Sequence, residues 1–189
     1  METDPRHLLV KVARILDRLD IPYAVTGGMA IYVWGRPRFT ADIDIVVLLK
    51  VLRVGELTRA LSRLGEAGYI SEDAIRRALE THGEFNFIDG GSGIKVDFWI
   101  SGDAAYDKSR FKNRVAKTIL GYHVFFVSPE DLILSKLRWH VLGESSRQLE
   151  DVESILNAQK KLNRDYLYKW AKIHKTIQIL HTLWKQSKK

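Results

Sequence analysis

The chain has 189 residues, 46% of them hydrophobic and 28% charged, so it is long enough to bury a hydrophobic core and too apolar to be a disordered protein. It contains no cysteine, which excludes disulfide-stapled scaffolds, thiolate metal sites and cysteine nucleophiles. Its net charge of +7 is uneven: residues 160–189 contain nine Lys and Arg against one acid, and the rest of the chain contains 21 basic and 22 acidic side chains. The body of the chain is therefore nearly neutral.

The beginning of the chain predicts helices that alternate with short strands. Apolar residues recur at helical spacing over 5–20, and a strand is expected over 23–26. Gly27 and Gly28 then turn the chain into a second helix, which we expect over 29–34.

The apolar, β-branched run over 42–49 is typical of a buried strand. It is followed by a predicted amphipathic helix over 53–67 that ends at Gly65–Gly68, a short helix over 72–80, and two hairpins with strands over 84–88 and 94–100 and over 115–120 and 122–127.

From Ser128 onward the pattern is helical, with Ser128 suited to the N-cap and Pro129 to the first helical position. Helices are expected near 128–141, 147–159, 163–173 and 175–186. We therefore predict an α/β protein in which residues 1–127 form a mixed sheet flanked by helices, and residues 128–189 form a helical region packed on that core.

The last two predicted helices carry an apolar stripe opposite their lysines. Packing on the core is the first interpretation of this stripe, and a surface for RNA or for a second copy of the chain is the alternative. Its members are Tyr166, Trp170, Ile173, Ile177, Leu180 and Trp184.

The N-terminus lacks a basic segment followed by an apolar one, and the longest apolar runs fall far short of the roughly 20 residues that span a bilayer. We therefore expect a cytoplasmic protein with no membrane partner.

Three aspartates suggest a metal site. Asp42 and Asp44 project from one face of the predicted strand, about 6–7 Å apart, and repel each other unless a cation lies between them. Hard oxygen ligands suit Mg²⁺. Asp97 alternates with apolar neighbours in a later strand, and completes a three-carboxylate cluster if the two strands pair. Such a cluster can hold two metal ions for in-line phosphoryl transfer.

Gly27 and Gly28 suggest a phosphate site. A strand that turns through two glycines into a helix presents backbone N–H groups at the positive end of the helix dipole. Turn chemistry alone is the alternative explanation.

The combination of Gly27 and Gly28, then Asp42, Ile43 and Asp44 after a spacer, then Asp97, resembles the DNA polymerase β-like nucleotidyltransferase superfamily. The sequence of residues 27–44 and the helical segment over 128–156 are similar to those of its compact prokaryotic branch, which includes aminoglycoside nucleotidyltransferases and AbiEii-type toxins. The resemblance covers roughly residues 21–170.

The resemblance implies a metal-dependent nucleotidyltransferase that moves a nucleoside monophosphate from an NTP such as ATP to an acceptor hydroxyl and releases pyrophosphate. It implies two Mg²⁺ ions, or Mn²⁺, on Asp42, Asp44 and Asp97, with Asp97 also deprotonating the acceptor. The residues expected to bind the nucleotide are Gly27, Gly28, Arg38 and Lys136.

Several alternatives stay open at this point. Asp42 and Asp44 could be solvated acids, Asp97 an exposed edge residue paired with Lys95, and Arg38 and Lys136 solvated cations. Asp151 is interpreted first as a structural salt bridge with Arg147, one helical turn before it, and second as a minor site residue.

The acceptor is equally open. It could be a tRNA or other RNA reached through the basic tail, a protein hydroxyl, or an antibiotic, and a homodimer or an antitoxin partner is possible. A non-catalytic binding or antitoxin module with the same fold is the alternative that involves no chemistry.

Overall fold

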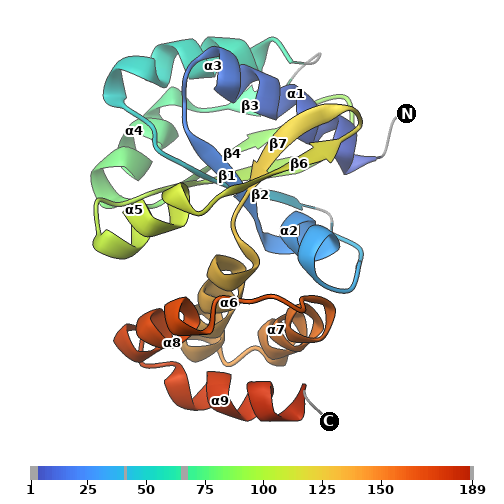
Figure 1. Ribbon diagram of the computed structural model, residues 1–189. Coiled ribbons are helices and arrows are strands. Elements are labelled where there is room, and N and C mark those ends of the chain that lie inside the picture. Colours follow the sequence, from blue (N-terminus) through green and yellow to red (C-terminus); the bar gives the residue numbers. More distant parts are fainter. Residues whose placement is uncertain (1–3, 41, 65–67, 188–189) are drawn as a thin grey trace. The chain divides into compact units, whose positions relative to one another are not determined.

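The Asp42–Val47 strand, β2, lies at the centre of a mixed sheet in the computed structural model, which describes residues 4–40, 42–64 and 68–187 (Figure 1). The strands lie in the order β3-β4-β5-β2-β1-β7-β6. The other strands of the described residues are β1 (Tyr23–Thr26), β3 (Tyr69–Ile70), β4 (Glu84–Ile88), β5 (Lys95–Ile100), β6 (Val115–Ile119) and β7 (Tyr122–Phe126).

The sheet contains both parallel and antiparallel pairs. β2 pairs with β5 in parallel and with β1 antiparallel, and β1 pairs with β7 in parallel. Both predicted hairpins are confirmed, since β4 pairs antiparallel with β5, and β6 with β7. The two hairpins therefore sit on either side of the central β1–β2 pair.

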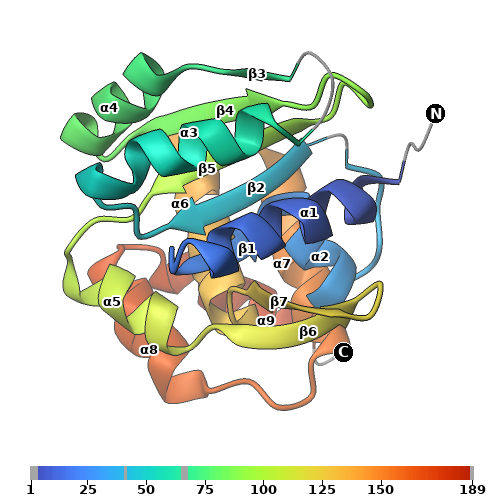
Figure 2. The same ribbon diagram turned by 90° about the horizontal axis from the view of Figure 1, so that it is seen from above.

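Side-chain alternation gives the central strands an apolar face and a polar face. Ile43 and Ile45 of β2 and Val96 and Phe98 of β5 are fully buried, whereas the aspartates between them are only partly buried. Helices α1 (Pro5–Arg18) and α3 (Val54–Ser62) lie together over one face of the sheet, and α4 (Glu72–Thr81) packs against α3 and β4 (Figure 2).

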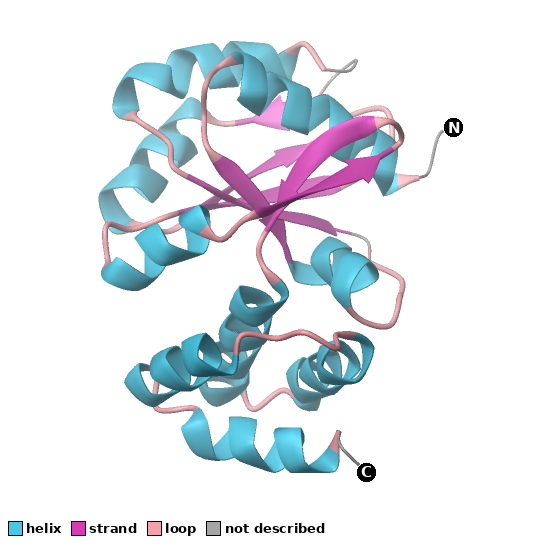
Figure 3. Cartoon of the chain, in the orientation of Figure 1, coloured by secondary structure: helices cyan, strands magenta, loops and turns pink. Residues whose placement is uncertain are grey.

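The chain folds as two compact units, and neither of them is continuous in sequence. The first comprises residues up to Met29 together with Phe39–Phe126, and the second comprises Ala30–Arg38 together with the chain from Val127 onward. Every strand that the structure describes belongs to the first unit (Figure 3). The second is helical, with α6 (Pro129–Gly143), α7 (Ser146–Ala158), α8 (Arg164–Ile173) and α9 (Ile177–Gln186).

Trp34 holds the segment over 30–38 in the helical unit through two hydrogen bonds. Trp34 ends helix α2 (Gly27–Trp34), and its indole N–H donates to the carbonyl of Val127 at 2.9 Å. The Gln159 side chain donates to the Trp34 carbonyl at 2.7 Å. Trp34 is also buried, so the end of α2 belongs to the core of the second unit.

The helices expected after Ser128 are confirmed, and the cap of α6 is as predicted. The Ser128 hydroxyl accepts from the backbone N–H of Asp131 at 3.0 Å and donates to the Asp131 carboxylate at 2.7 Å. Pro129 occupies the first helical position. This reciprocal pair fixes the start of α6.

Several boundaries differ from the prediction by a few residues. Helix α2 begins at Gly27 rather than Met29, and β2 ends at Val47 rather than Leu49. Helix α3 ends at Ser62, and part of its predicted end, over 65–67, lies outside the described residues.

Sequence reasoning missed β3 and α5 (Ala105–Lys112). Helix α5 buries only Tyr106 and Phe111 and is otherwise polar, so it has little helical periodicity to detect. β3 has only two residues, too short for any alternation to show. None of the helices in the described ranges is long and apolar enough to cross a membrane.

Candidate active site

The pairing of β2 with β5 places the three predicted aspartates on one face of the sheet. In this parallel register Asp44 lies opposite Asp97, and Asp42 lies opposite Lys95. Neighbouring strands are about 4.8 Å apart, and paired residues point to the same face. The side chain of Asp97 is 13% exposed. The structure therefore places Asp42, Asp44 and Asp97 on one face of the sheet, and the strand pairing that the sequence analysis required for Asp97 is confirmed.

Lys95 lies among these carboxylates. Its ammonium contacts the Asp97 Oδ2 atom at 2.7 Å. The hydrogen bond to Asp97 raises the Lys95 pKa, burial opposes the rise, and the charges of Asp97, Asp42 and Glu84 add to it. The alternative interpretation described Asp97 as an exposed edge residue paired with Lys95. The ion pair with Lys95 is confirmed. The edge position is wrong, because β5 lies inside the sheet between β4 and β2.

The donor chemistry of this face fits a divalent cation. Three carboxylates share it, oxygen ligands suit Mg²⁺, and the Asp97 carboxylate already holds a cationic group. Within residues 4–40, 42–64 and 68–187, however, no group of three or more His, Cys, Asp or Glu side chains is arranged to hold a metal ion. The aspartates share a face, and their side chains are not gathered around one point.

The two glycines bring the first turn of α2 against this face. Gly27 has φ +59°, and a Cβ atom built on it would lie 2.5 Å from Cγ of Asp44. A Cβ atom on Gly28 would lie 2.6 Å from Cβ of Thr40. Both positions therefore require glycine, whose lack of a side chain lets the backbone approach Asp44 and Thr40 closely.

Two polar residues that the sequence analysis missed extend the row of aspartates. The register pairs Thr26 of β1 with Asp44 and Asn86 of β4 with Asp97, so Thr26, Asp44, Asp97 and Asn86 form one line across four strands. The alternation of Glu84–Ile88 would have revealed Asn86 if the hairpin register had been known. Thr26 gives no separate signal, because its strand is short.

Arg38 and Lys136 meet on a buried carboxylate in the helical unit. Asp151 of α7 accepts from Nε and Nη2 of Arg38, both at 2.9 Å, and from Nζ of Lys136 of α6 at 2.8 Å. The Asp151 side chain is 4% exposed and that of Lys136 is 9% exposed. Asp151 thus forms a structural salt bridge, as predicted, but with Arg38 and Lys136 in place of the expected Arg147.

Two opposing effects set the ionisation of Asp151. Burial raises its pKa, but the hydrogen bonds and charges of Arg38 and Lys136 outweigh burial and hold the pKa below its usual value. The carboxylate is therefore ionised at neutral pH, and the three groups together carry a net charge of +1.

The match to known proteins decides the family. The family model described as "Nucleotidyl transferase AbiEii toxin, Type IV TA system" matches residues 12–179. The chain belongs to the AbiEii nucleotidyltransferase family. It is therefore a nucleotidyltransferase, an enzyme that transfers nucleoside monophosphates. No curated protein matches the sequence.

Solved structures confirm the nucleotidyltransferase fold of this AbiEii-family chain. The antibiotic-resistance factor ANT(2'')-Ia is 18% identical with a TM-score of 0.63, over 96% of this chain and 97% of the other. An antigenic nucleotidyltransferase-like protein from Paracoccidioides brasiliensis is also 18% identical, with a TM-score of 0.59, over 97% and 93%. At these identities the likeness concerns the fold.

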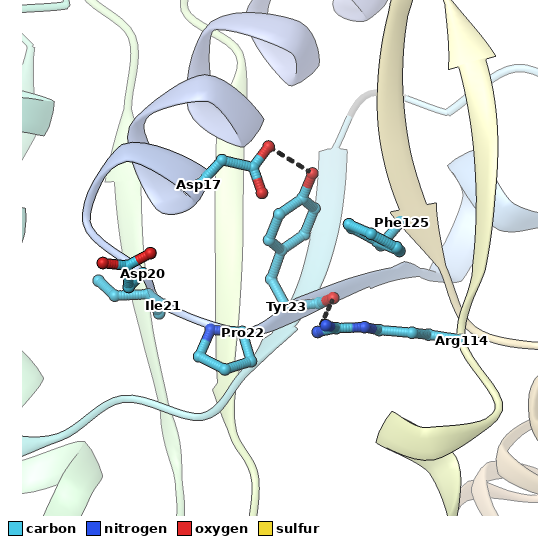
Figure 4. Close-up of a pocket in the computed structure, with 7 residues that line it drawn as sticks. All are labelled: Asp17, Asp20, Ile21, Pro22, Tyr23, Arg114 and Phe125. Carbon is cyan, nitrogen blue, oxygen red and sulfur yellow. Dashed lines mark hydrogen bonds between the residues drawn. The ribbon is translucent and has the colours of Figure 1, made fainter.

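A pocket of about 220 Å³ lies at the other end of β1 in this AbiEii-family protein (Figure 4). Asp17 accepts from the hydroxyls of Tyr23 at 3.4 Å and Tyr122 at 2.8 Å, and burial and Asp17 raise the Tyr23 pKa. The Arg114 guanidinium lies 4.5 Å from the centre of the Phe125 ring and contacts the Tyr23 carbonyl. None of the predicted site residues lines this pocket.

Proposed function

We propose that this AbiEii-family enzyme transfers a nucleoside monophosphate from an NTP to an acceptor hydroxyl in a reaction that depends on a divalent metal. The acceptor oxygen bonds to the α-phosphorus, the bond from that phosphorus to the bridging oxygen breaks, and pyrophosphate leaves. The observation that carries the proposal is the register of β2 and β5, which sets Asp44 opposite Asp97 beside the glycines that begin α2.

Asp42, Asp44 and Asp97 are the residues that would hold Mg²⁺ or Mn²⁺. When bound, one or two such ions would neutralise charge on the triphosphate and polarise its phosphorus centre. Asp97 has a second role, accepting the proton of the acceptor hydroxyl. This role suits a carboxylate that is mostly buried yet still reached by solvent.

Gly27 and Gly28 are proposed to receive the triphosphate. The first turn of α2 offers backbone N–H groups at the positive end of its dipole, and the absence of side chains lets an anion approach that backbone. The contact between Gly27 and Asp44 supports this assignment, since it places the phosphate-binding turn directly beside a proposed metal ligand.

Arg38 and Lys136 are proposed to bind the nucleotide as well. Asp151 restricts both cations and leaves the group a net positive charge, a combination suited to an anion. Arg38 keeps 26% of its side chain exposed, so it is the more accessible of the two.

An RNA acceptor, such as a tRNA, is proposed from the basic C-terminal segment. The Arg164 guanidinium lies 5.3 Å from the ring centres of both Tyr168 and Trp184. Lys169 and Lys172 of α8 and Lys161, which precedes that helix, are exposed. Aromatic rings beside cations suit nucleic-acid bases and phosphates. The toxin–antitoxin description of the family adds an antitoxin protein as a proposed partner.

The deciding experiment offers each labelled NTP, with Mg²⁺, to separate pools of tRNA, total protein and aminoglycosides. We expect label in the tRNA pool, and none with Asp44→Asn, which keeps the size of the side chain beside Gly27. Asp103→Asn, an exposed position in the first unit, is the matched control and should label like the wild type.

Label in the aminoglycoside pool would replace RNA by an antibiotic as the acceptor. Label that persists in Asp44→Asn, or that does not require a divalent ion, would contradict the assignment of the aspartates. To test the tail, RNA binding is measured at rising salt with Lys169 and Lys172 changed to Gln. An unchanged salt dependence would remove the tail from the RNA interface.

A further inference from the structure

Lys95 is a charged residue of the aspartate face whose place the proposed reaction does not explain. Its Cα atom is opposite that of Asp42, and its ammonium contacts Asp97 Oδ2 at 2.7 Å. Its side chain is 41% exposed, against 13% for Asp97. The carboxylate is thus held in the sheet, whereas the lysine reaches it on a long and partly solvated side chain.

We propose that Lys95 is the counter-ion of the aspartate cluster in the metal-free enzyme, and that a divalent ion must displace its ammonium from Asp97 before that carboxylate becomes a full metal ligand. This inference rests on the proposed function, because the metal site concerned is the same one.

The charges of the cluster explain why such a counter-ion is needed. Asp42, Asp44 and Asp97 lie on two adjacent strands, where like charges side by side destabilise the sheet. Lys95 lowers the charge of the group from −3 to −2 and contacts the acid opposite Asp44. Glu84, the other acid that acts on Lys95, is on β4 and lies opposite Trp99.

The geometry also explains why the lysine can leave. An ion pair with an exposed partner is weak, so a divalent cation can displace the lysine at a small cost in free energy. The contact involves one carboxylate oxygen, Oδ2. Lys95 therefore lowers the affinity for the metal without closing the site, and it partly offsets the negative charge of the carboxylates while no metal is bound.

The test is a Mn²⁺ titration of the full chain without nucleotide, followed by electron paramagnetic resonance at fixed pH and low salt. Lys95→Met removes the charge and keeps the length of the side chain, and we expect it to bind Mn²⁺ roughly three- to fivefold more tightly than the wild type. Lys95→Arg keeps the charge and should stay within about twofold of the wild type. Lys108→Met, at an exposed lysine of α5, is the matched control and should not change the affinity.

A second measurement uses thermal unfolding with and without Mn²⁺. The Lys95→Met variant should gain more stability from the metal than the wild type gains, because the metal no longer has to displace an ammonium from Asp97. Lys95→Gln should behave like Lys95→Met, so the test does not depend on one variant folding well.

The Asp44→Asn variant distinguishes a failure of the proposed role of Lys95 from a failure of the proposed metal site. If it weakens Mn²⁺ binding while Lys95→Met binds as the wild type does or less tightly, the role of Lys95 is overturned and the metal site stands. If Asp44→Asn and Lys95→Met both bind Mn²⁺ as the wild type does, the proposed metal site is wrong and the role of Lys95 falls with it.

Discussion

The two charged clusters of the protein, one in each unit, differ in sign and in exposure. In the first unit three aspartates share one lysine, which is 41% exposed. In the second, two cations share Asp151, which is 4% exposed. The first cluster has unneutralised charge in contact with solvent and can exchange its partner. The second is paired and buried, so its groups hold one another in place.

This difference predicts that substitutions in the two clusters differ in how much they lower the stability of the fold. A buried ion pair leaves an uncompensated charge when one partner is removed, whereas a solvated pair contributes little. Substitutions in the aspartate cluster should therefore abolish transfer and leave folding nearly unchanged. Substitutions at Asp151 should destabilise the helical unit.

The largest expected effect is that of Asp97→Asn on catalysis. The amide cannot accept the proton of the acceptor and is a poorer metal ligand, so nucleotide transfer should fall by roughly 10²–10⁴. The free energy of unfolding should change by less than about 1 kcal/mol, because only a partly exposed pair with Lys95 is lost. Transfer assays and urea denaturation measure the two quantities. A loss of stability as large as the loss of activity would mean that the cluster is structural.

Asp151→Asn should show the reverse pattern in stability. The substitution leaves Lys136 buried and Arg38 half-buried without their carboxylate, which should cost about 3 kcal/mol of unfolding free energy. Glu150→Gln changes the exposed neighbour on the same helix and should cost almost nothing. Equal urea midpoints for the two variants would refute the structural role of the buried pair.

Gly27→Ala tests the contact between the phosphate-binding turn and the aspartate cluster. Gly27 has φ +59° and faces Asp44, whereas Gly121 has φ +77° with open space around it. Alanine at either site should cost about 1 kcal/mol through the backbone alone. Only Gly27→Ala should also displace Asp44 and lower nucleotide transfer. If both variants keep full activity, the close approach at Gly27 has no part in catalysis.

The smallest effect concerns acid sensitivity in the helical unit. Burial and the charge of Arg138 lower the His174 pKa to about 4, from an ordinary value near 6.5. Between these two pH values His174 is protonated in the unfolded chain and neutral in the folded chain. Its contribution to the free energy of unfolding is therefore complete above pH 6.5 and is lost as the pH falls toward 4. His174→Gln should flatten this part of the stability curve. His123→Gln, at an exposed strand position, should leave it unchanged.

The sequence predicts the local placement of the site residues well and their partners poorly. Alternation alone puts Asp42 and Asp44 on one face, because it depends only on the period of a strand. Asp97 required knowledge that β5 pairs with β2, which no short-range signal contains. The partners of Asp151 show the same limit. Helical spacing suggested Arg147, but Arg38 reaches the carboxylate from 113 positions away in sequence.

The apolar stripe predicted for the last two helices is interrupted where the first of them ends. Ile173 is 58% exposed, because α8 ends there and Lys175, with φ +58°, redirects the chain into α9. Trp170 and Leu180 are buried, as the stripe requires. Periodicity predicts which face of each helix is buried, but it does not predict the burial of a residue at the end of a helix.

The division of α2 between the two units has a consequence for how the protein can be taken apart. Gly27 and Gly28 lie against Asp44 and Thr40, whereas Trp34 is bound to Val127 and Gln159. No single cut of the chain therefore separates the units, because a fragment that stops before residue 128 would still contain Ile31 and Trp34, both buried, without most of their core. A fragment that ends before the helical unit would therefore expose these two side chains to solvent.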